Sequence, residues 1–183
     1  MGLIKNYLIS FLWGFAEATF FFIVPDVFLS YLSVKYNLKT AIKSALFTLS
    51  GAFIGGVIIY HLGNSYSSDI IDYIDILPAI SPAMIVTAKE DLEQFGILSI
   101  LIGAFSGVPY KVFAAQAGQL SIPLISFIAI FIPARLIRWF QVIFIAQLIG
   151  NILLNHVSKK FVLWAFFSFW VIFYSLFFVF MPN

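Results

Sequence analysis

Glu17, Asp26, Lys111, Arg135 and Arg138 are charged residues placed well inside otherwise apolar stretches of the chain. One charge at the centre of a bilayer costs about 2.5–3.5 kcal/mol on insertion scales. Five such charges facing lipid would cost on the order of 15 kcal/mol, comparable to the stability of a whole domain. We therefore expect all five side chains to face inward, where they can contact each other, water or a ligand.

The types and spacing of these residues suit the binding of an anion. Arg135 and Arg138 lie one helical turn apart and project from one face, and guanidinium forks match phosphate groups. We expect Lys111 and Arg135 to bind an anionic headgroup and Arg138 to guide it. We expect Glu17 and Asp26 to exchange the protons that couple transport.

Each of these residues also has a purely structural interpretation, which the sequence leaves open. Glu17 could be a protonated carboxyl group bonded to a neighbouring helix, and Asp26 could cap the helix that it begins. Lys111 could do no more than neutralise Asp26. Arg138 could extend toward the cytoplasmic surface without contacting a ligand.

A short motif occurs twice, as VPDVF from Val24 and as VPYKVF from Val108. Each copy breaks an apolar segment beside a charged residue, and the expected break residues are Pro25, Gly107 and Pro109. Broken apolar segments in corresponding places of two halves indicate a binding site at the interface of an inverted repeat. We expect Asp26 and Lys111 to meet there across the pseudo-twofold axis.

The composition excludes several classes of protein. The chain is 62% hydrophobic and 10% charged, whereas about a quarter of the residues in soluble domains are charged. A net charge of +2 does not indicate nucleic-acid binding, and the absence of cysteine excludes disulfides and thiolate metal sites. His61 and His156 have no neighbours at ligand spacing. We therefore expect that the protein is not an enzyme and binds no metal or cofactor. We interpret the first apolar stretch as part of the mature protein and not as a signal peptide.

Five apolar regions predict an all-α membrane protein. Two uninterrupted regions of about 20 residues and a longer one containing Pro133 are predicted to span a membrane; they are residues 41–62, 161–181 and 124–150. The regions 7–34 and 95–122 contain the two breaks. They are predicted to be re-entrant hairpins. The backbone N–H and C=O groups at such breaks need hydrogen-bond partners from protein or from a water-filled cavity when they lie at membrane depth.

The distribution of lysine supports this topology, since cytoplasmic loops gather Lys and Arg. If each hairpin returns to the side of the membrane from which it entered, one face of the membrane receives most lysines. These are Lys5, Lys35, Lys39, Lys43, Lys159 and Lys160. The opposite face receives Asp69, Asp72, Asp75 and Lys89. The N-terminus is then cytoplasmic and the C-terminus external.

The predicted organisation is one membrane domain over residues 1–183. It has a first hairpin plus span (7–62), an external loop with a short helix (63–94), a second hairpin plus span (95–150) and a final span (161–181). The short helix is expected to begin at Pro82. A small-residue face formed by Gly51, Gly55 and Gly56 predicts close helix packing.

The ordered motifs between Gly14 and Gly150 resemble those of the DedA (VTT, or SNARE-associated) family, and the YqaA-like subgroup in particular. They are Ala16-Glu17, Val24-Pro25-Asp26, Gly51-Ala52, Tyr60-x-Leu62-Gly63, Phe105-x-Gly107-Val108-Pro109, Ala117-Gly118 and Arg135-x2-Arg138. The resemblance implies paired re-entrant hairpins, a bacterial inner-membrane location, and relatives that flip undecaprenyl phosphate or scramble phospholipids. Lys111 and Ala104 stand where many members have two hairpin arginines.

The expected function is therefore that of a flippase-like or scramblase-like translocase of a membrane lipid or a polyprenyl-phosphate-like substrate, with proton coupling. A structural or assembly factor whose buried charges only lock the hairpins is the alternative of a different class, and a small-anion transporter is a third. Homo-oligomerisation stays open.

Overall fold

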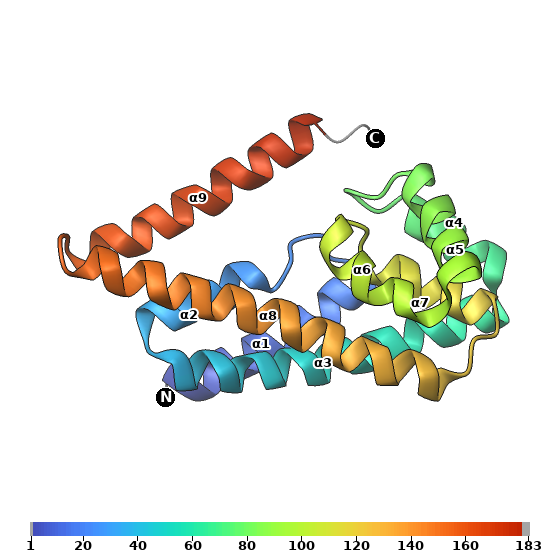
Figure 1. The fold of residues 1–183 in the computed structure, drawn as a ribbon, viewed down its shortest axis with the longest axis horizontal. Helices are drawn as coiled ribbons and strands as arrows, with labels where there is room; N and C mark the ends of the chain where they lie inside the picture. Colours follow the sequence, from blue (N-terminus) through green and yellow to red (C-terminus); the bar gives the residue numbers. More distant parts are fainter. Residues whose placement is uncertain (1, 181–183) are drawn as a thin grey trace.

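The computed structural model describes residues 2–180, with the side chains of residues 104–106 left out (Figure 1). The last residue of the predicted final span, Met181, and the side chain of Ala104 therefore lie outside the described part. All regular secondary structure within the described residues is helical, which confirms the predicted all-α class.

Three helices are long and apolar enough to cross a membrane: α3 (Leu38–Ser65), α8 (Leu124–Leu154) and α9 (Lys159–Phe180). They coincide with the three predicted spans and are compatible with a membrane protein. α3 and α8 run the length of the molecule in opposite directions (Figure 1). α3 begins earlier than predicted because the Asn37 side chain accepts a hydrogen bond from the Thr40 backbone N–H at 2.9 Å and caps the helix.

Two pairs of shorter helices approach the middle of the molecule from its opposite ends (Figure 1). The first pair is α1 (Gly2–Thr19) and α2 (Asp26–Lys35). The second is α6 (Ser99–Ser106) and α7 (Tyr110–Gln119). This pair follows the helix α5 (Pro82–Phe95) through the 3-10 turn η1 (Gly96–Leu98).

The helices of each pair are separated by a non-helical break, at residues 20–25 in the first pair and 107–109 in the second. Pro25 directly precedes α2, and Pro109 directly precedes α7. Gly107 ends α6 with a φ of 89°, a left-handed conformation that glycine adopts without steric cost. The sequence-predicted break residues thus stand at the ends of these helices.

The segment between α3 and α6 is more helical than predicted. It holds α4 (Ser67–Asp75) as well as the expected α5 (Pro82–Phe95), which begins at the predicted proline. α4 forms because its acidic residues share an outer face while Ile70 and Ile74 are buried. The prediction of a mostly irregular loop was therefore wrong.

Glycines let α3 pack closely against both α1 and α7. A Cβ atom on Gly51 would collide with the backbone of Phe11 in α1, and one on Gly63 would collide with the backbone of Ala115 in α7. Gly14 and Gly118 make the reciprocal approaches. The predicted small-residue face on α3 is thus confirmed as a packing surface.

We expect Gly51→Val to destabilise the protein by about 1–3 kcal/mol or more, because the added side chain must separate α3 from α1. Ser50→Val is the matched control, since Ser50 is exposed on the same helix. Thermal unfolding of both variants in detergent measures the difference. Equal stabilities would contradict the close α1–α3 contact.

Candidate functional site

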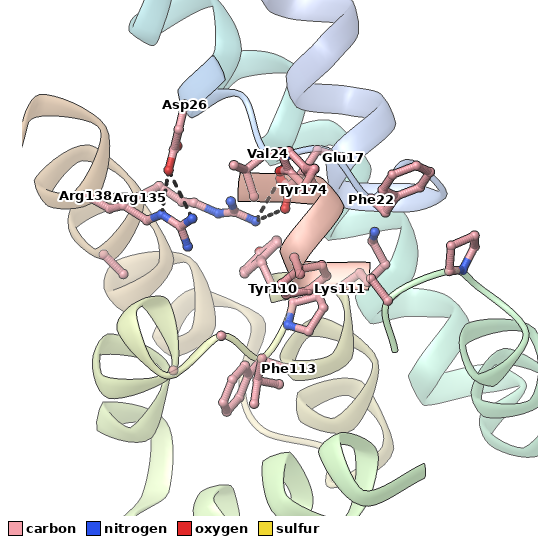
Figure 2. A pocket seen from close by; sticks show the side chains of 18 of the residues that line it. Glu17, Phe22, Val24, Asp26, Tyr110, Lys111, Phe113, Arg135, Arg138 and Tyr174 are labelled. Carbon is pink, nitrogen blue, oxygen red and sulfur yellow. Dashed lines mark hydrogen bonds and ion pairs between the residues drawn. The ribbon is translucent and has the colours of Figure 1, made fainter. Parts of the chain in front are cut away.

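A cavity of about 270 Å³ lies where the two breaks meet (Figure 2). All five charged residues singled out from the sequence line it, and they come from four helices: α1, α2, α7 and α8. These residues are Glu17, Asp26, Lys111, Arg135 and Arg138. The structure therefore brings together every residue that was predicted to bind substrate or couple protons.

Glu17 of α1 and Arg135 of α8 form a buried ion pair. The Arg135 Nη2 lies 3.0 Å from the Glu17 Oε2 and donates a hydrogen bond of 3.1 Å to Oε1. Only 7% of the arginine side chain and 5% of the glutamate side chain are exposed. Removing either partner would leave a desolvated charge, so this pair strongly constrains how α1 meets α8.

Arg135 has a second partner in the aromatic ring of Tyr110, which begins α7. The guanidinium carbon lies 4.4 Å from the centre of that ring, within the range of a cation–π interaction. Tyr110 in turn stacks on Phe131, with 4.4 Å between ring centroids. The Tyr110 hydroxyl group is buried without a hydrogen-bond partner and lies against Gly56, so the ring is the part of Tyr110 that acts on Arg135.

Asp26 and Arg138 form a second ion pair beside the first (Figure 2). The Nε of Arg138 donates to the Asp26 Oδ2 at 3.0 Å, and Nη2 lies 3.0 Å from the same oxygen. Asp26 is buried, but 28% of the Arg138 side chain is exposed. The second carboxylate oxygen, Oδ1, is buried without a partner. This pair has room to exchange partners.

Lys111 does not pair with Asp26, and the expected contact across a pseudo-twofold axis is wrong. Its Nζ donates a hydrogen bond of 2.7 Å to the backbone carbonyl of Phe21 in the first break. The physical reason is that Arg138 already reaches Asp26, whereas the non-helical carbonyl of Phe21 needs a donor. Lys111 is only 2% exposed. Among the described residues, no carboxylate lies within ion-pair distance of it.

Further side chains form hydrogen bonds with backbone groups of the first break. The Trp13 Nε1 donates to the carbonyl of Ile23 at 2.9 Å, and the Val24 N–H donates to the Tyr174 hydroxyl group at 2.8 Å. Sequence reasoning missed Tyr174 and Tyr110, because aromatic residues in apolar segments face lipid by default. The usable signal for Tyr174 was its hydroxyl group, since a tyrosine that is buried usually needs a polar partner, whereas Tyr110 acts through its ring.

The charges of the site favour an anion. Three cationic side chains and two carboxylates leave one positive charge in excess when all are ionised. The rest of the lining is mostly apolar and aromatic, and it includes Phe22, Phe113 and Phe131. Such a lining can hold a charged group at one end and a hydrocarbon group at the other.

Comparison with known proteins gives relatives without a stated activity. An uncharacterized protein of Haemophilus influenzae is 35% identical over 129 residues, which cover 70% of this chain and 66% of that protein. An uncharacterized protein of Methanocaldococcus jannaschii is 27% identical over 145 residues, covering 78% of this chain and 86% of that protein. The match thus spans just under two thirds of the Haemophilus protein. No family model and no solved structure matches the chain.

We expect Glu17→Leu to destabilise the protein by about 3–5 kcal/mol, because Arg135 would be left buried without its acid. The double variant Glu17→Leu with Arg135→Met should recover most of this loss, since it removes both charges. Chemical unfolding in detergent provides the measurement. A double variant as unstable as the single one would show that the pair does not account for the effect.

Proposed function

We propose that this protein is a translocase for a membrane lipid or lipid phosphate and that a proton gradient drives it. The observation that carries the proposal is the cavity between the two breaks, which has paired charges on one side and aromatic rings on the other. An ionisable residue at membrane depth is by default a candidate for substrate binding or proton transfer. Five of them around one cavity strengthen this interpretation.

In this proposal the phosphate group of the substrate binds near Lys111, which has no carboxylate of the described residues within ion-pair distance. Arg135 and Arg138 lie at the same cavity and can offer further N–H donors when their acids release them. Bound phosphate then replaces a carboxylate as the partner of a guanidinium group.

Asp26 is the better placed of the two acids to couple protons. Its partner, Arg138, is partly exposed, and its Oδ1 has no hydrogen-bond partner. Protonation of Asp26 releases Arg138 and adds one positive charge to the cavity, which favours entry of an anion. Loss of the proton restores the ion pair and favours release. Glu17 and Arg135 follow the same logic in a more buried setting.

The proposal includes a membrane arrangement of the DedA type, with α1–α2 and α6–α7 as two re-entrant hairpins in inverted orientation. Support comes from the two pairs approaching the centre from opposite ends (Figure 1). Further support comes from the first break, whose carbonyl and N–H groups find partners in Trp13, Lys111 and Tyr174. Irregular backbone at membrane depth requires such internal partners. The proposed location is a bacterial inner membrane.

One observation favours the alternative of a structural or assembly factor. Both arginines already have carboxylate partners, and Arg135 is almost fully buried. Under this alternative the ion pairs only hold the helices together. A transporter of small soluble anions is less well supported, because the aromatic part of the lining would then have no ligand to contact.

The proposed topology predicts that Lys39→Cys and Lys159→Cys react with a membrane-impermeant thiol reagent from one side and that Asp72→Cys reacts from the other. All three side chains are exposed, and α3 and α9 begin at the end of the molecule opposite α4 (Figure 1). The native chain has no cysteine, so each variant carries one thiol. Labelling of positions 39 and 159 from opposite sides would rule out the double-hairpin arrangement.

The proposed function predicts headgroup-specific flipping in proteoliposomes, stimulated by a proton gradient. We expect Asp26→Asn to abolish the stimulation while the protein stays folded, because the neutral amide cannot exchange a proton. Asp69→Asn, on the exposed face of α4, is the matched control and should behave like the native protein. Normal stimulation in Asp26→Asn would show that Asp26 does not carry the coupling proton, whereas no flipping by the native protein would favour the assembly-factor alternative.

A further inference from the structure

We infer that the space between α9 and α6 binds the hydrocarbon chain of a phosphate-headed lipid. The headgroup lies in the charged cavity, and the chain extends sideways from it through this space. The inference rests on the proposed function for its headgroup site. It adds where the apolar part of the substrate lies and through which side of the protein the substrate enters.

One wall of the cavity is a row of aromatic side chains on α9. They are Phe169, Trp170, Phe173, Tyr174 and Phe177. Phe169 is 58% exposed and Phe173 is 45% exposed, although both line the cavity. These two rings therefore have one part at the cavity and another part at the outer surface of the molecule.

The facing wall comes from the second helix pair and its approach. Ile100 and Gly103 of α6, Val108 of the second break, and Pro78 and Ala79 before α5 line it. The main packing partners of α9 are α2 and α8. Among the described residues α9 has no comparable packing against α6, and its ribbon diverges from α8 (Figure 1), which points to an opening of the cavity between α9 and α6.

Two hydrogen bonds fix the aromatic wall relative to the charged end. The Tyr174 hydroxyl group accepts from the Val24 N–H at 2.8 Å, and the Trp170 Nε1 donates to the Ser30 Oγ at 3.0 Å. Val24 lies two residues before Asp26, so the apolar wall begins directly beside an ion pair of the headgroup site.

The charges and the apolar wall together identify the occupant. Lys111, Arg135 and Arg138 complement an anionic group, and the α9 rings complement a hydrocarbon chain. Free phosphate would leave the aromatic wall without a ligand. A neutral lipid would leave the excess positive charge without one. An amphiphile with a phosphate head matches both ends of the same cavity.

The test uses the full chain in lipid nanodiscs and two lipids that carry the same photoreactive acyl chains. One is a phosphatidic acid, and the other is the matched diacylglycerol, which lacks the phosphate. After illumination, mass spectrometry locates the labelled residues. We expect the lipid with the phosphate to label the five wall residues of α9 about tenfold more than the neutral lipid, as loss of charge-assisted contacts implies. Phe167, which is 59% exposed and does not line the cavity, should be labelled equally by both.

A pair of variants ties the labelling to the aromatic wall. Phe173→Ser should reduce the phosphate-dependent labelling of the remaining wall residues several-fold, because it removes apolar contact with the chain. Phe167→Ser should leave this labelling unchanged. Equal labelling of the wall by both lipids, or equal effects of the two substitutions, would overturn the inference.

Proteoliposomes that contain the same protein and the same lipids separate this inference from the proposed function. Phosphate-dependent labelling of the wall without any flipping would retain the binding site and remove translocation. Uptake of inorganic phosphate into proteoliposomes, without phosphate-dependent labelling, would overturn the lipid site and leave an anion transporter.

Discussion

The contact of Arg135 with Glu17 and Tyr110 is the interaction on which the rest of the structure depends. It joins α8 to α1 through an ion pair and to α7 through an aromatic ring. A guanidinium group that is almost fully buried must find such partners, because desolvating an unpaired charge costs several kcal/mol. The two partners lie at the end of α1 and the start of α7, next to the two breaks. Satisfying one charge therefore brings both breaks to the same place and creates the cavity between them.

This arrangement needs helices that approach more closely than ordinary side chains allow. Gly14 and Gly51 place α1 against α3, and Glu17 follows one turn after Gly14. Gly56 gives space to the ring of Tyr110, whose hydroxyl group lies where a larger residue would put its Cβ atom. The glycines of α3 thus set the depth of Glu17 and of Tyr110. The ion pair and the cation–π contact depend on both depths.

The features that could be predicted from the sequence are those that a large energetic cost determines. The inward position of Glu17 and Arg135 follows from the cost of exposing a charge to lipid, and the helix breaks follow from the local effect of Pro25, Pro109 and Gly107 on the backbone. The choice of partner did not follow. Whether Asp26 meets Arg138 or Lys111 is decided by shifts of a few ångströms at helix ends, which residue types do not encode. The helix α4 was not predicted because it spans only nine residues, which is too short for a clear periodic pattern.

The two ion pairs are chemically alike but physically unequal, and this difference suggests a division of roles. Glu17 and Arg135 are both enclosed, and the ring of Tyr110 gives the guanidinium group a second partner. Asp26 keeps one oxygen without a partner, and Arg138 reaches the surface of the molecule. The Asp26–Arg138 pair is therefore the more accessible of the two to water and to a ligand. Within the proposed function, the outer pair is therefore the first to exchange its carboxylate for a phosphate, and the enclosed pair does so at a greater cost in buried charge.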